Sequence, residues 1–187
     1  MDYAHRVTEA NLQICERNHW VYQISWCHRV LGDLDFDPST SSGQRSGNHE
    51  SARTHYETAL KIARSISKRD VLIEALLARG SFFAKVAVGA ESPRPNDAHL
   101  GSGDPTPTIN DAFTDLNEAL IYAVEGGYRI YEADVRVALG WAYLANGEKE
   151  KAKESAQRAL QMSQEMGYHW GKVDAEEVLE RMNASRE

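Results

Sequence analysis

The stretch LGWAYLANGEKEKAKESAQRAL, residues 139–160, predicts two helices joined by a tight turn at Asn146–Gly147. The first helix carries the pair Leu139–Gly140 near its middle. In the second, Ala152 and Ala159 are seven residues apart and therefore lie on one face. Small residues at these positions let two helix backbones approach closely, so the stretch predicts a packed helical hairpin.

The same small residues recur earlier in the chain: Ala112 with Ala119, Ala52 with Ala59, and the glycines Gly80 and Gly32. The offset between successive units becomes constant at about 40 residues when residues 37–48 and 88–108 are treated as insertions. Both insertions are rich in Gly, Pro and Ser and fall between the glycine-bearing and the alanine-bearing helix of a unit. We therefore expect both to project from the same edge of a helical repeat array.

The predicted array is one all-α domain over residues 1–187, with about three helix pairs and a half-unit at each end. Its parts are an orphan second helix at 1–17, repeats at 20–66, 70–126 and 129–166, and a capping helix at 169–184. An orphan second helix exposes an apolar stripe that its partner helix would cover. We expect the chain to be part of a longer array, or to dock there on another chain or on a second copy as a homodimer.

Composition narrows the function classes. The chain has 187 residues, 42% hydrophobic and 26% charged, with a net charge of −7, so it lacks the positive field that nucleic-acid binding requires. No window is apolar enough to cross a bilayer, and the N-terminus lacks the order of a signal peptide. These features predict a cytoplasmic protein that binds neither nucleic acid nor membrane.

The repeat pattern resembles the tetratricopeptide repeat family. The last unit fits best, because Leu139–Gly140 is followed by the large Tyr143, and then by Ala152 and Ala159 in the second helix. The first unit fits except at Asp35, which stands where the family has a bulky residue. The 40-residue spacing is similar to the longer-helix variety found in sensor arms of bacterial signalling ATPases and related regulators, with HEAT and armadillo repeats as the competing label.

This resemblance implies an α-α superhelix that acts as a non-catalytic scaffold for a protein or peptide, within a larger signalling or regulatory assembly. The alternative is a regulator that senses a small effector in its groove, and an unrecognised enzyme remains a third class. The first helices of such repeats line a concave face. The residues expected there are Trp26, Arg29, Asp33, Glu74, Leu77, Ser81, Lys85, Asp134, Val137, Trp141, Leu144, Asp174, Glu177 and Arg181.

Within this set, Glu74, Asp134 and Asp174 share one register and predict an acidic row along the groove. Such a row favours a partner with a basic or amine-bearing group, for which Trp141 offers an apolar or cation–π platform. The alternative interpretation is a set of solvated helix starts, where carboxylates suit the helix dipole.

Candidate chemistry elsewhere is sparse. Cys15 and His19 are four residues apart, as metal ligands on one helix face can be. However, Cys15 and Cys27 occupy small-residue positions of the repeat, which predicts buried packing residues. The aromatic residues of Tyr168–Trp170 are expected to pack at a repeat junction. We therefore expect no metal, no cofactor and no catalytic residue.

Overall fold

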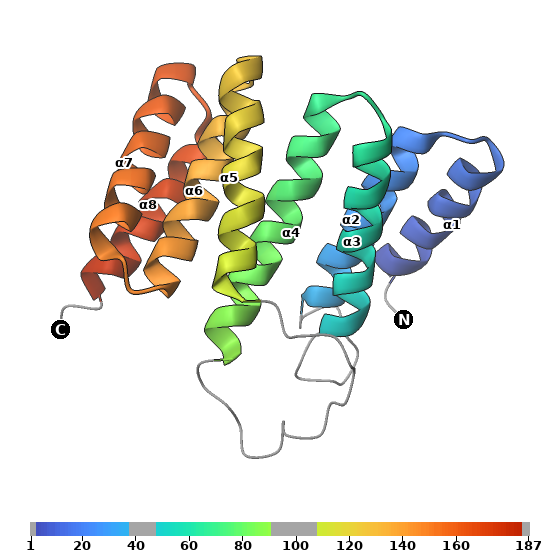
Figure 1. Cartoon of the computed structure of the whole chain (residues 1–187), viewed down its shortest axis with the longest axis horizontal. Helices are drawn as coiled ribbons and strands as arrows, with labels where there is room; N and C mark the ends of the chain where they lie inside the picture. The colour runs from blue at the N-terminus through green and yellow to red at the C-terminus, as the bar shows by residue number, and fades with distance from the viewer. Residues whose placement is uncertain (1–2, 38–47, 91–107, 185–187) are drawn as a thin grey trace. The chain divides into compact units, whose positions relative to one another are not determined.

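A computed structural model describes residues 3–37, 48–90 and 108–184, which form eight α-helices and no strand (Figure 1). The helices are α1 (Tyr3–Arg17), α2 (Val21–Phe36), α3 (His49–Ser65), α4 (Arg69–Ala90), α5 (Ile109–Gly126), α6 (Arg129–Ala145), α7 (Lys149–Met166) and α8 (His169–Ala184). Consecutive helices pack against each other in pairs, α2 with α3 and α6 with α7 among them. The prediction of an all-α fold built from helical hairpins is confirmed.

The two expected insertions lie largely outside the described residues. Residues 38–47 fall within the first and residues 91–107 within the second. The helix α4 continues to Ala90, three residues into the stretch 88–108 that the sequence assigned to an insertion. The grouping of the helices into repeats of one array remains a prediction.

Helix ends follow local sequence signals. At the start of α5, Thr108 and Asp111 form a capping box, in which each side chain bonds the backbone of the other residue. The turns after α5, α6 and α7 place Gly127, Gly147 and Gly167 at φ of 68°, 75° and 66°. Only glycine adopts this left-handed conformation without steric cost, and the predicted turn at Asn146–Gly147 is confirmed.

The helix contacts fall into two compact units, Met1–Arg79 and Gly80–Glu187, with the boundary inside α4. In unit 1, α2 packs against both α1 and α3. A Cβ atom added at Gly32 would lie 2.9 Å from the Tyr56 ring, so glycine is what allows α3 to approach α2. The Ser25 hydroxyl, buried in the same contact, donates a hydrogen bond to the Ala59 carbonyl at 3.0 Å.

Unit 2 contains two further glycines that allow neighbouring helices to approach closely. A Cβ at Gly80 would lie 2.8 Å from the Leu116 side chain, and one at Gly140 would lie 3.2 Å from Val178. The recurring alanines of both units are fully or almost fully buried, namely Ala52, Ala59, Ala112, Ala119, Ala152 and Ala159. Their burial confirms that the repeat pattern encodes helix packing.

Both cysteines lie in the core of unit 1, as the small-residue register predicted. Cys15 comes from α1 and Cys27 from α2. Burial raises the pKa of the Cys27 thiol to about 11, and the neighbouring Cys15 adds to this shift. Both are therefore packing residues, and Cys27 carries little thiolate at neutral pH.

Candidate functional site

In unit 1, α2 and α4 bring three of the predicted groove residues to one pocket. Its lining is Tyr22, Ser25, Trp26, Arg29, Val71, Glu74 and Ala75. Trp26 is 43% exposed and presents part of its ring at the rim of this pocket. The enclosed part of the pocket has room for about one water molecule. The pocket is therefore a surface depression beside an exposed tryptophan.

The side chain of Arg29 is held in place by its neighbours. Its guanidinium carbon lies 6.0 Å from the centre of the Trp26 ring, and its Nη1 donates to Asp33 Oδ2 at 2.9 Å. From α3, the Tyr56 hydroxyl donates to the other Asp33 oxygen at 2.7 Å. Arg29 Nε is buried without a hydrogen-bond partner among the described residues. This group is a donor that a water or a partner's carbonyl would satisfy.

In unit 2, Asp134 of α6 and Asp174 of α8 lie close enough to interact through their charges. Burial raises the pKa of Asp134 to about 6; a hydrogen bond from Tyr168 opposes this shift, and the Asp174 carboxylate adds to it. The pKa of Tyr168 is raised to about 12 by burial and by both carboxylates. These three side chains, two carboxylates and one phenol, form an acidic cluster.

Val137 corrects one part of the predicted groove. It is 8% exposed and belongs to the core cluster of unit 2 with Ala156, Ala159, Ala175 and Val178. The Val137 side chain of α6 packs against residues of α7 and α8. It is therefore a core residue and offers almost no surface to a partner.

Trp141 also packs against this core cluster and is only partly exposed. Its ring therefore stabilises unit 2 in addition to any contact that it makes with a partner. Trp26 has more free surface than Trp141 and is the stronger aromatic candidate.

The other predicted residues differ in accessibility. Leu77, Ser81 and Leu144 are partly buried, and Lys85, Glu177 and Arg181 are exposed. Glu74 and Leu77 fall in unit 1, whereas Ser81 and Lys85 fall in unit 2. The structure joins two members of the acidic row, Asp134 and Asp174, and the continuation of the row to Glu74 remains a prediction.

The sequence pattern missed Tyr168 as a member of the acidic cluster. Its hydroxyl bonds Asp134, although the residue was expected only to pack at a junction. The turn that precedes α8 positions it, since Tyr168 N donates to Ser163 O at 2.8 Å. No local signal reports a bond between side chains 34 positions apart in the chain.

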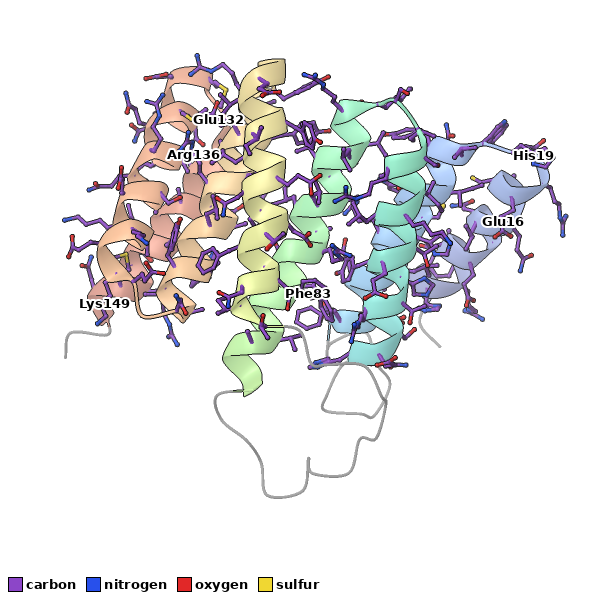
Figure 2. All side chains as sticks on the ribbon, viewed as in Figure 1. Glu16, His19, Phe83, Glu132, Arg136 and Lys149 are labelled. Carbon is purple, nitrogen blue, oxygen red and sulfur yellow. The ribbon has the colours of Figure 1, made fainter. Side chains whose placement is uncertain are left out.

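Among the residues that the structure describes, no group of three His, Cys, Asp or Glu side chains could hold a metal ion. Within the same ranges no helix is long and apolar enough to cross a membrane. On α6, the partly buried side chains of Glu132 and Arg136, labelled in Figure 2, form an ion pair of 2.8 Å.

Comparison with known families agrees with this architecture. Residues 133–166, which cover most of α6 and all of α7, match the family model described as tetratricopeptide repeat. No curated protein matches the sequence significantly. The chain thus carries a tetratricopeptide repeat at residues 133–166, and its eight described helices fit a tetratricopeptide-repeat-like protein.

Proposed function

We propose that this protein binds peptide segments of partner proteins, without catalysing a reaction, at two surfaces that are each described by themselves: the exposed face of α2 in unit 1 and the exposed faces of α6 and α8 in unit 2. The tetratricopeptide repeat supports a protein-interaction scaffold in general. A place in a larger cytoplasmic signalling or regulatory assembly is part of the proposal. Preformed helices suit this role, because a rigid surface loses little entropy when a partner binds.

The observation that carries the proposal is the arrangement of Trp26 and Arg29. A tryptophan that is 43% exposed next to a fixed guanidinium has the composition of an interface hot spot. Arg29 is already oriented by Asp33, so a partner gains its contact without ordering a long side chain. Its Nε offers a hydrogen-bond donor for a peptide carbonyl.

The acidic cluster of unit 2 supports a basic or amine-bearing group on the partner. Asp134 and Asp174 repel each other, and this repulsion adds to the effect of burial on the Asp134 pKa. A cation placed between the two carboxylates would relieve the repulsion and favour the ionised form of Asp134. Binding of such a group is therefore expected to release a proton near pH 6.

The alternative, a regulator that senses a small effector, is supported less well by the pocket that Trp26 lines. Sites for small molecules commonly enclose roughly 300–1,000 Å³. The enclosed space beside Trp26 holds about one water molecule. An extended peptide lying over the exposed ring fits this surface better than a buried ligand does.

The test compares partner capture by the wild type with capture by Trp26→Ala and Asp134→Asn. Ile121→Ala is the control, because Ile121 is 56% exposed and belongs to α5, outside the proposed binding faces. For a captured partner, a peptide titration by fluorescence anisotropy should show a loss of at least about tenfold in affinity for Trp26→Ala, as expected for a hot spot. Unchanged affinity in both site variants would refute the proposal.

A second copy of the chain is the partner that we propose for α1. Tyr3, Val7 and Ile14 are exposed and lie on one helix face, since they are spaced four and seven residues apart. In an antiparallel pair of α1 helices, Tyr3 of one copy meets Ile14 of the other. Sedimentation velocity should show concentration-dependent dimers that Ile14→Glu abolishes and that Ile121→Glu, a change at an exposed isoleucine of α5, leaves intact. A monomeric wild type at all concentrations contradicts this part.

A further inference from the structure

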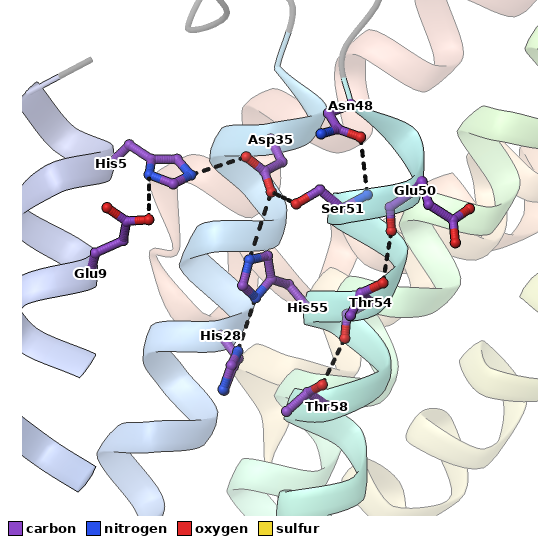
Figure 3. A network of polar contacts seen from close by, with 10 residues as sticks. All are labelled: His5, Glu9, His28, Asp35, Asn48, Glu50, Ser51, Thr54, His55 and Thr58. Carbon is purple, nitrogen blue, oxygen red and sulfur yellow. Dashed lines mark hydrogen bonds and ion pairs between the residues drawn. The ribbon is translucent and has the colours of Figure 1, made fainter. Parts of the chain in front are cut away.

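A polar network crosses α1, α2 and α3 in unit 1, and Asp35 is its centre (Figure 3). His5 Nε2 of α1 lies 3.1 Å from Asp35 Oδ1. The Ser51 hydroxyl donates to Asp35 Oδ2, and His55 Nε2 lies 3.7 Å from the same oxygen. The other ring nitrogen of His55, Nδ1, is 2.9 Å from His28 Nδ1 of α2. Three histidines from three helices are thus joined through one carboxylate.

Asp35 is the residue that departs from the repeat pattern, and unit 2 shows what replaces the network in a regular repeat. Aligning Gly32 with Gly140 matches Asp35 with Tyr143 and His28 with Arg136. Tyr143 packs its ring on Phe113, with a centroid distance of 4.8 Å, as the bulky residue of the pattern should.

The network residue His55 of α3 also has a counterpart in α7. Aligning Ala52 with Ala152 matches His55 with Ser155. The Ser155 hydroxyl donates to the Arg136 carbonyl at 2.9 Å, so the matching contact in unit 2 contains no group that titrates between pH 5 and 8. The two hairpins form a natural comparison, one with a histidine pair and one without.

The contact between His28 and His55 accommodates one proton but not two. At 2.9 Å one Nδ1 must donate and the other must accept, so at least one ring accepts through a bare nitrogen. A proton added to the accepting nitrogen turns both nitrogens into donors that face each other, and an added proton on each ring places two cations side by side. Burial lowers the pKa of His28 to about 4, and His55 adds to this shift.

Charged and titratable groups on α1 and α2 shift the pKa of His55 in both directions. Burial lowers the pKa of His55, and His5 of α1 adds to this shift, whereas the carboxylates of Asp35 and Glu9 oppose it. His5 itself lies between Asp35 and Glu9, whose Oε1 is 3.5 Å from His5 Nδ1.

We propose that this network makes the packing of α2 and α3, together with α1, a proton-sensitive element, which mild acid opens locally while the α6–α7 hairpin stays closed. The direction follows from proton linkage. The unfolded chain binds a proton at His28 below pH 6.5 and the folded chain does so only near pH 4. The contribution of His28 to the stability of the folded state is therefore fully present above pH 6.5 and is lost as the pH falls from 6.5 towards 4.

Hydrogen exchange of the full-length chain, followed by mass spectrometry at pH 7.5 and 5.5 and corrected for the intrinsic pH dependence of exchange, tests this inference. We expect peptides from α1, α2 and α3 to lose at least about tenfold in protection at pH 5.5. Peptides from α6 and α7 should lose no protection. Equal protection of α1–α3 at the two pH values, or an equal loss in both units, would overturn the proposal.

Variants assign the effect to the histidine pair. His28→Gln removes one titrating ring and keeps a polar side chain, so the loss of protection at pH 5.5 should shrink. His19→Asn is the matched control, because His19 lies outside the network in the same unit and its φ of 57° suits asparagine. Should His28→Gln fail to fold, the histidine ring signals of the wild type decide the matter by NMR. An ordinary midpoint near 6.5 for both His28 and His55 refutes the proposal.

Discussion

The Tyr56 hydroxyl of α3 donates a hydrogen bond of 2.7 Å to the Asp33 carboxylate of α2, across the contact that Gly32 makes possible. Burial, followed by the nearby Asp33 charge and this bond, raises the pKa of Tyr56 far above its usual value. Asp33 also holds Arg29, so one bond links the core of unit 1 to the proposed binding face.

Replacing Tyr56 by Phe should therefore destabilise unit 1 by about 1.5 to 3 kcal/mol, the usual contribution of a hydrogen bond to a charged acceptor. Phenylalanine keeps the ring that packs against Gly32. Urea unfolding of Tyr56→Phe, Asp33→Asn and the double variant measures the coupling between the two side chains. Strictly additive effects would contradict a direct bond.

Replacing the packing glycines by alanine should lower stability most where the added Cβ lies closest to a neighbouring side chain. A Cβ at Gly32 or Gly80 would lie 2.9 or 2.8 Å from a neighbouring side chain, whereas at Gly140 the closest distance is 3.2 Å. Overpacking costs about 1–3 kcal/mol, against a gain of about 1 kcal/mol from replacing glycine in a helix. Thermal melts should therefore place Gly32→Ala and Gly80→Ala below the wild type and Gly140→Ala near it. Equal stability of all three variants would contradict the packing described.

The pH dependence of unit 2 should have the opposite sign to that of unit 1. The pKa of Asp134 is raised from 3.8 to about 6, so the folded state holds this proton more tightly. The contribution of the protonated Asp134 carboxyl to the stability of the folded state is fully present below pH 3.8 and is lost as the pH rises through about 6. Asp134→Asn should thus stabilise the protein at pH 7.5 by on the order of 1 kcal/mol, with a smaller gain at pH 5. Comparing variant and wild type at each pH cancels the histidine effect, and an equal gain at both pH values would refute the assignment.

The cysteines should be inert while the chain is folded. Both thiols are buried, and the raised pKa of Cys27 leaves little thiolate at neutral pH. Alkylation by iodoacetamide at pH 7.5 should be at least about 100-fold slower than in concentrated guanidinium chloride, because reaction requires opening of the α1–α2 contact. Rapid labelling of the folded protein would show that this contact is open.

The sequence by itself determined the helices, the turns between them and the small residues that pack them. Gly127 and Gly147 end helices because a left-handed residue can be recognised locally, and the alanine spacing marks a buried face because a helix repeats every 3.6 residues. Asp35 was visible as a departure from the pattern, but its three histidine partners were not.

Which side chains meet depends on how the helices pack. The tertiary structure buried Val137 in the core, joined Tyr168 to Asp134, and brought His5, His28 and His55 around one carboxylate. The physical reason is that periodicity fixes the face on which a side chain lies, whereas its neighbours depend on the rotation and separation of two packed helices. Those quantities arise from the whole set of contacts, and no short stretch of sequence contains them.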